Sequence, residues 1–152
     1  MCPAATGKNP VWESKRLVDL DEFEWEALCD GCGKCCLVKI EDEDSGDIAF
    51  TRVACELLDT ETCRCNDYAN RLVKVPDCLQ LSATNIASVP WLPVTCAYRL
   101  RHESKPLYPW HPLVSGSQDS VHEAGMSVQG RVISEQYVHS DGLDEHVIHW
   151  IE

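Results

Sequence analysis

Four cysteines in one eight-residue stretch have the clearest chemistry in this sequence. Residues 29–36 read CDGCGKCC, so three sulfurs follow one another at intervals of three residues and a fourth is adjacent to the third. A two-residue gap lets a tight turn aim two sulfurs at one metal ion, and Gly31 and Gly33 can adopt the backbone angles that such turns use. The spacing therefore predicts a metal-binding knuckle.

Five further cysteines follow at wider spacings that only a fold can bring together. Taken alone, each of these five cysteines would be a buried small residue about as often as a metal ligand. The presence of the knuckle makes the ligand interpretation the better one. The candidate metal ligands are Cys29, Cys32, Cys35, Cys36, Cys55, Cys63, Cys65, Cys78 and Cys96. Nine thiols suffice for one centre with spares or for two centres. Cys2 stands apart and is not in this set.

Zinc and an iron-sulfur cluster are both compatible with this spacing. Structural zinc takes four thiolates or imidazoles, and an iron-sulfur cluster generally takes four thiolates. The bacterial ferredoxin spacing fails at its fourth ligand, because Cys36 follows Cys35 at once and position 39 is Lys. A cation would remove the repulsion and desolvation that collected thiolates suffer in an acidic chain, so we expect the metal to be structural at minimum.

Composition and charge narrow the possible partners and compartments. The chain has 152 residues and a formal net charge of −12, which disfavours nucleic acid because phosphate binding relies on Lys and Arg. No apolar run is long enough to span a membrane, and the first residues lack the apolar block of a signal peptide. We therefore expect a cytoplasmic protein whose partners are a metal ion and an unidentified protein, with disulfides disfavoured.

Hydrophobic patterning predicts a small, irregular α+β domain with short helices, a β-hairpin and metal-organised loops. We expect one domain over residues 1–152, with a cysteine-rich region at 29–96 and a cysteine-free part at 97–152 packing on it. The elements expected are a helix over 20–28 capped by Asp19, a hairpin formed by 37–40 and 48–53, a helical turn at 66–71, a short helix after Ser82, a helix over 95–101, a strand over 128–134, and a helix or strand over 147–151.

Other residues with possible chemistry have simpler interpretations. We expect His111, between two prolines, to be a packed loop histidine rather than a metal ligand. No Glu or third His completes a metal set with His146 and His149. Tyr68 and Arg71 are expected to clamp the Cys65 turn, with Arg71 donating to carbonyls or to a thiolate. The acidic run at 41–47 lacks the ligand order of a calcium loop and is expected to be a solvated turn.

Several motifs together resemble a known protein family. The segments CDGCGKCC, TCRCNDYANR, VPDCLQL, WLPVTCAYR and WHPLVSGS are similar to those of the bacterial YcgN-like proteins, within the wider YkgJ-type cysteine-cluster group of zinc- or iron-chelating domains. The resemblance covers residue 12 to the end of the sequence. It departs from the wider group where Leu72 rather than Pro follows Arg71. It marks seven cysteines as ligands by motif, with Cys55 and Cys96 added by the closer match.

Two functional hypotheses follow. The first is a cysteine-cluster protein that binds zinc or an iron-sulfur cluster and acts as a structural, interaction or metal-handling module. The alternative is an iron-sulfur-dependent redox enzyme or an accessory part of a methyltransferase-type enzyme, because related cysteine clusters resemble accessory parts of flagellin lysine methylases. The sequence has neither a Gly-rich nucleotide loop nor a paired acid and base, which opposes the enzyme hypothesis without deciding it.

Overall fold

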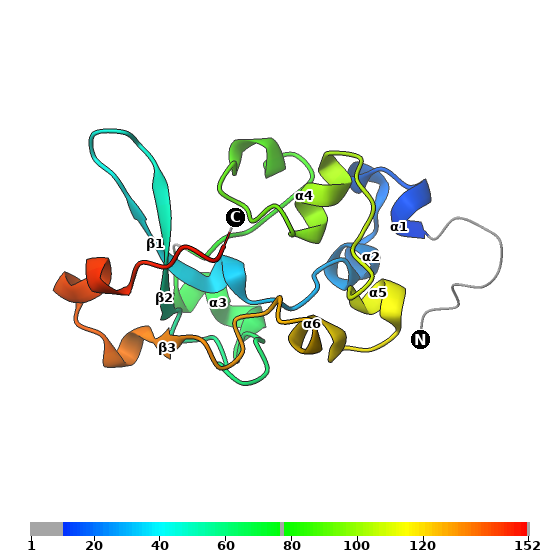
Figure 1. The fold of residues 1–152 in the computed structure, drawn as a ribbon. Coiled ribbons are helices and arrows are strands. Elements are labelled where there is room, and N and C mark those ends of the chain that lie inside the picture. The colour runs from blue at the N-terminus through cyan, green and yellow to red at the C-terminus, as the bar shows by residue number, and fades with distance from the viewer. Residues whose placement is uncertain (1–10, 77, 152) are drawn as a thin grey trace. The chain divides into compact units, whose positions relative to one another are not determined.

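The knuckle motif marks the border between two parts of the chain. The computed structural model describes residues 11–76 and 78–151 (Figure 1). Contacts divide these residues into two compact units. Unit 1 contains residues 11–31 and 81–126, and unit 2 contains the described residues of 32–80 together with 127–151. The border therefore falls between Gly31 and Cys32. Whether these units form one domain stays a prediction, whereas the predicted small α+β class is confirmed.

Unit 1 is built from short helices. Trp25 and Tyr98 join two of them, because their rings lie 4.6 Å apart and the Tyr98 hydroxyl donates to the Trp25 carbonyl at 2.7 Å. Leu28 and Val121 are fully buried in this unit. Its helices, with 3-10 turns written η, are α1 (Val11–Ser14), η1 (Leu17–Asp19), α2 (Glu22–Ala27), η4 (Ile86–Ser88), α4 (Ala97–His102), α5 (Pro112–Ser115) and α6 (Ser120–Glu123).

The helix that leads to the knuckle is confirmed, but its predicted cap is wrong. Asp21 caps α2 by accepting from the Glu24 N–H at 2.8 Å, and the Glu24 carboxylate accepts from the Asp21 N–H at 2.9 Å. Asp19 instead ends η1 and pairs with Arg16 at 2.9 Å. The reciprocal Asp21–Glu24 pair satisfies two helix-end N–H groups at once.

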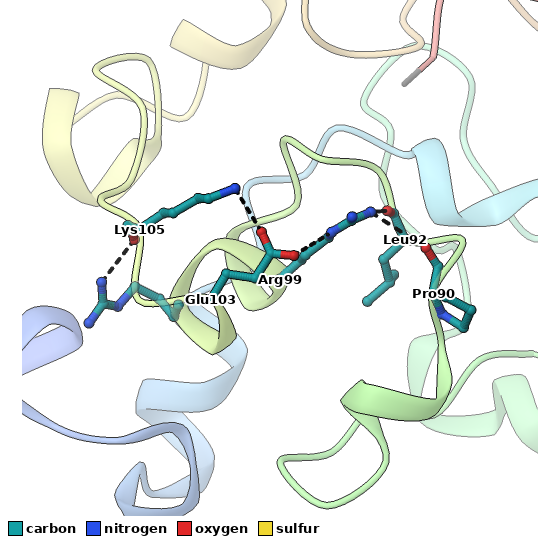
Figure 2. A network of polar contacts seen from close by, with 6 residues as sticks. Pro90, Leu92, Arg99, Glu103 and Lys105 are labelled. Atoms are coloured by element: carbon teal, nitrogen blue, oxygen red, sulfur yellow. Dashed lines mark hydrogen bonds and ion pairs between the residues drawn. The ribbon is translucent and has the colours of Figure 1, made fainter.

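A polar network holds the segment that precedes Cys96. Arg99, in α4, donates to the carbonyls of Leu92 and Pro90, and its Nε lies 3.0 Å from Glu103 (Figure 2). Lys105 completes the network at 3.0 Å from the other oxygen of Glu103 (Figure 2). One guanidinium therefore fixes the turn at 90–92 to the helix that begins after Cys96.

We expect Arg99→Met to lower the free energy of unfolding by about 1–3 kcal/mol, because two carbonyls and Glu103 lose a charged donor. Urea unfolding of the variant beside the wild type measures this change. Lys105→Met is the matched control, since its side chain is 61 % exposed and an exposed ion pair contributes about 0–1 kcal/mol. Equal effects of the two variants would contradict the assigned role of Arg99.

Unit 2 contains the predicted hairpin, which is confirmed. Strands β1 (Leu37–Glu41) and β2 (Ile48–Ala54) pair antiparallel (Figure 1). The Asp42 carboxylate organises the turn between them by accepting from the N–H groups of Asp44 and Ser45 at 2.8 and 2.9 Å. The other helices of unit 2 are η2 (Lys34–Cys36), η3 (Tyr68–Asn70), α3 (Arg71–Lys74), η5 (Glu135–Tyr137) and η6 (Ser140–His146).

The late part of the chain adds less strand than predicted. Strand β3 (Ile133–Ser134) is parallel to β2, which gives a sheet order of β1-β2-β3. The expected strand over 128–134 is wrong for its first five residues, because Gly130 has a φ of +73° and the Arg131 N–H closes a turn on Val128. Residues 147–151 are neither a helix nor a named strand, and Val147 only forms an isolated bridge with Thr51.

Among residues 11–76 and 78–151, no helix combines the length and the apolar character needed to cross a bilayer.

The middle helices match their predictions within a few residues. The turn expected at 66–71 appears as η3 followed directly by α3. The helix expected over 95–101 is α4, with Cys96 at its N-terminal boundary. After Ser82 the chain forms η4, and the Ser82 hydroxyl accepts from the Asn85 N–H at 3.2 Å.

Candidate metal centre

The predicted ligands divide unequally between the two units. Cys29 and Cys96 belong to unit 1, and the other seven belong to unit 2. Cys63 is buried, Cys29 and Cys35 are exposed, and the remaining six are half-buried. Cys2 lies outside the described residues. Most of the predicted thiols are therefore held by unit 2.

Backbone pairing brings three of the unit 2 cysteines together. The Cys55 N–H donates to the Cys36 carbonyl at 2.8 Å, which joins the residue after β2 to the residue before β1. Leu58 then donates to the Cys55 carbonyl at 2.9 Å and forms a bridge with Cys65. The hairpin therefore determines where these cysteines lie, although their separation in sequence reaches 29 residues.

Charge interactions extend this group to five thiols. The pKa of Cys36 is raised by its hydrogen bond with Cys35, by burial, and by the charges of Cys35, Cys55 and Cys78. Burial also raises the pKa of Cys78, which the charges of Cys65 and Cys35 raise further. Cys78 thus interacts with every other member of the group. We call this group the thiol cluster: Cys35, Cys36, Cys55, Cys65 and Cys78.

Lys39 places a positive charge beside the thiol cluster. Its Nζ donates to the carbonyls of Cys35 and Leu37 at 3.0 and 2.7 Å, and it lies 5.4 Å from the centre of the Phe50 ring. Burial lowers the pKa of Lys39, while the charges of three cluster sulfurs act in the opposite direction. In the sequence Lys39 only interrupts the ferredoxin spacing, because its distance from the sulfurs depends on the strand β1 that carries it.

Arg71 provides a second positive charge. Its guanidinium carbon lies 3.7 Å from the centre of the Tyr68 ring, and its NH1 donates to the Tyr68 carbonyl at 2.8 Å. Its charge and its hydrogen bond both act to lower the pKa of Cys78, against the larger effect of burial. The sequence associated Arg71 with the Cys65 turn, and the structure shows that it also reaches Cys78.

Cys63 lies in a different environment within unit 2. It has a φ of +59° and is 5 % exposed. Burial raises its pKa, and donation from the Ser127 hydroxyl and from the N–H groups of Val128 and Gln129 lowers it. The Val128 N–H also donates to the Cys32 carbonyl at 2.9 Å, and the Gln129 amide donates to the Glu61 carbonyl at 2.6 Å. Residues 127–129 thus hold the Cys63 turn, although no motif identifies them.

Gly33 allows Cys63 and residue 128 to approach the knuckle. It has a φ of +77°, and a Cβ at this position would lie 2.8 Å from Val128 Cγ2 and 3.3 Å from Cys63 Cβ. Only glycine accepts both this backbone angle and this contact. The glycine that the sequence identified as a turn residue therefore also makes space for a buried cysteine.

His111 packs inside unit 1, where it is 2 % exposed. Its Nδ1 accepts from the Leu113 N–H at 3.0 Å, so its Nε2 carries the hydrogen that is donated to the Leu28 carbonyl at 2.7 Å. Burial lowers the pKa of His111, although the Leu28 carbonyl and the Asp30 charge favour the protonated form. The imidazole is therefore neutral and fixes the backbone directly before Cys29.

This lowered pKa predicts a loss of stability in mild acid. The unfolded chain binds a proton at His111 at about pH 6.5, whereas the folded chain binds it only at lower pH, so stability falls as the pH drops below about 6.5. We expect the free energy of unfolding to decrease more between pH 7.5 and pH 5.5 in the wild type than in His111→Gln. Urea titrations at both pH values measure the difference, and identical decreases would contradict it.

The two C-terminal histidines do not form a paired site. His146 ends η6, and its Nδ1 accepts from Arg52 Nε at 2.8 Å. His149 is exposed and lies beyond the last helix. Across residues 11–76 and 78–151, no three His, Cys, Asp or Glu side chains are arranged so that they could hold a metal ion. The cluster sulfurs are therefore neighbours through their charges without standing in ligating positions, and Cys36, Cys55, Cys63, Cys65 and Cys78 carry free thiols.

Comparison with known proteins identifies the same cysteine-rich region. Residues 28–97, which contain all nine predicted ligands, match the CxxCxxCC family model, described as "Putative zinc- or iron-chelating domain". No solved structure matches the chain. The family model agrees with the chemistry expected of the thiols and does not distinguish between the two metals.

Curated relatives match nearly the full chain. A UPF0260 protein from Allorhizobium ampelinum is 52 % identical over 142 residues, which is 93 % of this chain and 89 % of that protein. Another, from Parvibaculum lavamentivorans, is 52 % identical over 94 % of both chains. A third, from Mesorhizobium japonicum, is 58 % identical over 82 % of this chain and 84 % of its own. None of these three names states an activity.

Proposed function

Because the chain belongs to the UPF0260 family of cysteine-cluster proteins, we propose that it binds zinc or an iron-sulfur cluster through cysteine thiolates. The thiol cluster carries this proposal. Five sulfurs that share one charged neighbourhood in an acidic protein would repel one another if ionised, and a bound cation removes that repulsion. Two protein cations beside the same sulfurs favour the ionised form that a metal requires.

The donor chemistry of the cluster fits both metals. Thiolates are soft ligands that select zinc, copper(I) and iron-sulfur clusters over magnesium or calcium. Cys35, Cys55, Cys65 and Cys78 offer four sulfurs, and Cys36 offers a fifth. A bound zinc ion would supply structural cross-linking of β1, β2 and the Cys78 loop, and an iron-sulfur cluster would supply the same cross-links together with electron transfer.

We propose the remaining ligands from the sequence and its family resemblance. Cys32 and Cys63 lie in unit 2, and the resemblance adds Cys29 and Cys96 of unit 1 to the set. The Ser127 hydroxyl and two N–H groups beside Cys63 are the kind of donors that stabilise a metal-bound thiolate. These donors beside the Cys63 sulfur are stronger support for Cys63 as a metal ligand than the spacing of Cys63 in the sequence.

The cellular role that we propose is a structural, interaction or metal-handling module in the cytoplasm. The absence of a sequence-recognisable nucleotide loop favours this role over a redox or transferase activity. Within the family we place the chain with the YcgN-like proteins, because the order and spacing of the five quoted segments support that narrower assignment.

Elemental analysis after anaerobic purification tests the proposal. We expect at least one equivalent of zinc, or several of iron with matching sulfide, per chain. Brown protein that absorbs at about 400 nm and bleaches with dithionite contains an iron-sulfur cluster. Colourless protein that releases zinc when its thiols are modified contains a zinc site. Protein that contains neither metal, and that takes up neither when supplied anaerobically, contradicts the proposed function.

A further inference from the structure

Cys36 and Cys55 lie directly opposite each other at the base of the hairpin. The pairing of β1 with β2 sets Leu37 opposite Ala54, so the next pair in the same register is Cys36 with Cys55. The Cys55 N–H donates to the Cys36 carbonyl at 2.8 Å, which extends the antiparallel pairing to these two residues. Because opposite residues of an antiparallel pair place their side chains on the same face, the two thiols start from one face of the hairpin.

This backbone geometry is the one that a disulfide requires. Residues opposite each other in an antiparallel pair have Cα atoms about 4.5–5.5 Å apart, and disulfides join cysteines with Cα atoms about 4.4–6.8 Å apart. The thiols also interact: the pKa of Cys36 is raised by its hydrogen bond with Cys35 and by burial, and the charge of Cys55 raises it further. The two sulfurs can therefore be joined without a rearrangement of the strands.

The neighbours of the two cysteines are packed, whereas the cysteines are within reach of small solutes. Leu37 and Ala54 are buried, and the Thr51 hydroxyl donates to the Val38 carbonyl at 2.7 Å, which fixes β2 to β1 beside the pair. Two groups held in a fixed geometry react with each other as if at a very high concentration. Cys36 and Cys55 themselves are only half-buried, so an oxidant of the size of water can reach them.

The other members of the thiol cluster are placed differently. Cys35 follows Cys36 in the opposite direction along the chain, and consecutive Cα atoms, about 3.8 Å apart, are closer than a disulfide usually allows. Cys65 faces a leucine across its isolated bridge. The Cys78 N–H closes a turn within its own loop. The paired backbones of Cys36 and Cys55 therefore single out these two cysteines.

We propose that Cys36 and Cys55 are a redox-active dithiol, which hydrogen peroxide converts reversibly into a disulfide. Peroxide oxidises one thiol to a sulfenic acid and releases one water molecule. The second thiol then attacks the sulfenic sulfur, an S–S bond forms, and the oxygen leaves as a second water molecule. The two sulfurs thus lose two electrons and two protons in total, which reduce the O–O bond of one peroxide. A dithiol reductant restores both thiols by exchange.

This inference goes beyond the proposed function, because it needs two sulfurs and no metal ion. Burial raises the pKa of Cys55, and the Glu135 charge adds to this effect, as burial and Cys35 do for Cys36. The pair therefore reacts through its proximity rather than through an activated thiolate. Disulfides in a reducing compartment are usually transient and redox-sensing, which is the behaviour expected of this pair.

Peroxide treatment of the full-length protein, as purified and freed of reductant, tests the proposal. Blocking the remaining thiols with iodoacetamide and analysing protease fragments by mass spectrometry identifies the linked residues. We expect the loss of two of the ten thiols, a linkage between Cys36 and Cys55, and the return of both thiols with dithiothreitol. Metal content measured beforehand on the same sample keeps this test separate from that of the proposed function.

Two variants serve as matched controls, because trypsin leaves Cys35 in one fragment with Cys36, and Cys63 in one fragment with Cys55. Cys35→Ser and Cys63→Ser should retain the linkage, whereas Cys36→Ser and Cys55→Ser should lose it. Circular dichroism shows whether each variant is folded. If Cys36→Ser or Cys55→Ser does not fold, fragmentation spectra of the linked wild-type peptides locate the joined sulfurs residue by residue.

Each result decides between the two proposals. A linkage between any other two cysteines, oxidation to sulfinic or sulfonic acids without a linkage, or no loss of thiols overturns the redox-active pair. Protein that contains metal and forms no Cys36–Cys55 linkage contradicts this inference alone. Protein that neither contains nor takes up metal, and still forms the linkage, contradicts the proposed function alone.

Discussion

Replacing Cys78 with serine is expected to remove bound metal and to abolish cooperative unfolding of the protein. Cys78 interacts with all four other members of the thiol cluster, so its loss affects each of them. Structural zinc contributes about 10–16 kcal/mol of folding free energy in finger peptides. That exceeds the typical net stability of a domain, about 5–15 kcal/mol. A lost ligand therefore removes most of the free energy that keeps unit 2 folded.

Metal content and thermal unfolding, measured on the same sample, check this expectation. Cys2→Ser is the matched control, because it makes the same exchange at the cysteine outside the predicted ligand set and should leave both measurements unchanged. If Cys78→Ser retained the wild-type metal content and Tm, Cys78 would not be a ligand, and the thiol cluster would lose the member that connects it.

Replacing Gly33 with alanine is expected to lower the free energy of unfolding by about 2–5 kcal/mol. A left-handed backbone costs a residue with a Cβ about 1–2 kcal/mol. The contact with Val128, at 2.8 Å, adds about 1–3 kcal/mol, because Val128 is fully buried. Metal binding should weaken as well, since the same Cβ would press on Cys63.

Gly130→Ala separates the two contributions. Gly130 has a φ of +73°, but a Cβ at this position would meet no atom within 4 Å, so only the backbone contribution of about 1–2 kcal/mol remains. A second comparison removes the contact instead: Val128→Ala should cost less stability in the Gly33→Ala background than in the wild type. Gly33→Ala and Gly130→Ala variants of equal stability would show that the contact with Val128 has no effect.

The sequence was most informative where structure depends on local signals. The hairpin over residues 37–54 follows from two apolar runs around a polar turn, and α4 beside Cys96 follows from its helical spacing. The knuckle glycines also have the positive φ angles expected of them. The Asp19 cap failed because Asp19 and Asp21 each have a glutamate at the third position after them, and the spacing alone does not show that Asp21 forms the capping box while Asp19 pairs with Arg16.

The features that the sequence could not predict depend on contacts between distant segments. Nothing in residues 127–129 indicates that they hold the Cys63 turn, since serine, valine and glutamine are common in any loop. Lys39 belongs to an ordinary strand pattern, and only the path of its side chain back to Cys35 places its charge at the sulfurs. Spacing of cysteines identified the donor atoms, whereas the groups that tune them required the fold.

The discontinuity of unit 2 has a consequence for protein synthesis. Residues 32–80 emerge from the ribosome before the 46 residues of unit 1 at 81–126, and only then do residues 127–151 add β3 and the donors to Cys63. Compact parts of a chain generally fold in the order in which they are synthesised. Unit 2 cannot complete its fold until residues 127–151 have been synthesised. The thiols at 32–80 therefore acquire their final surroundings only after the 46 intervening residues of unit 1 have been synthesised.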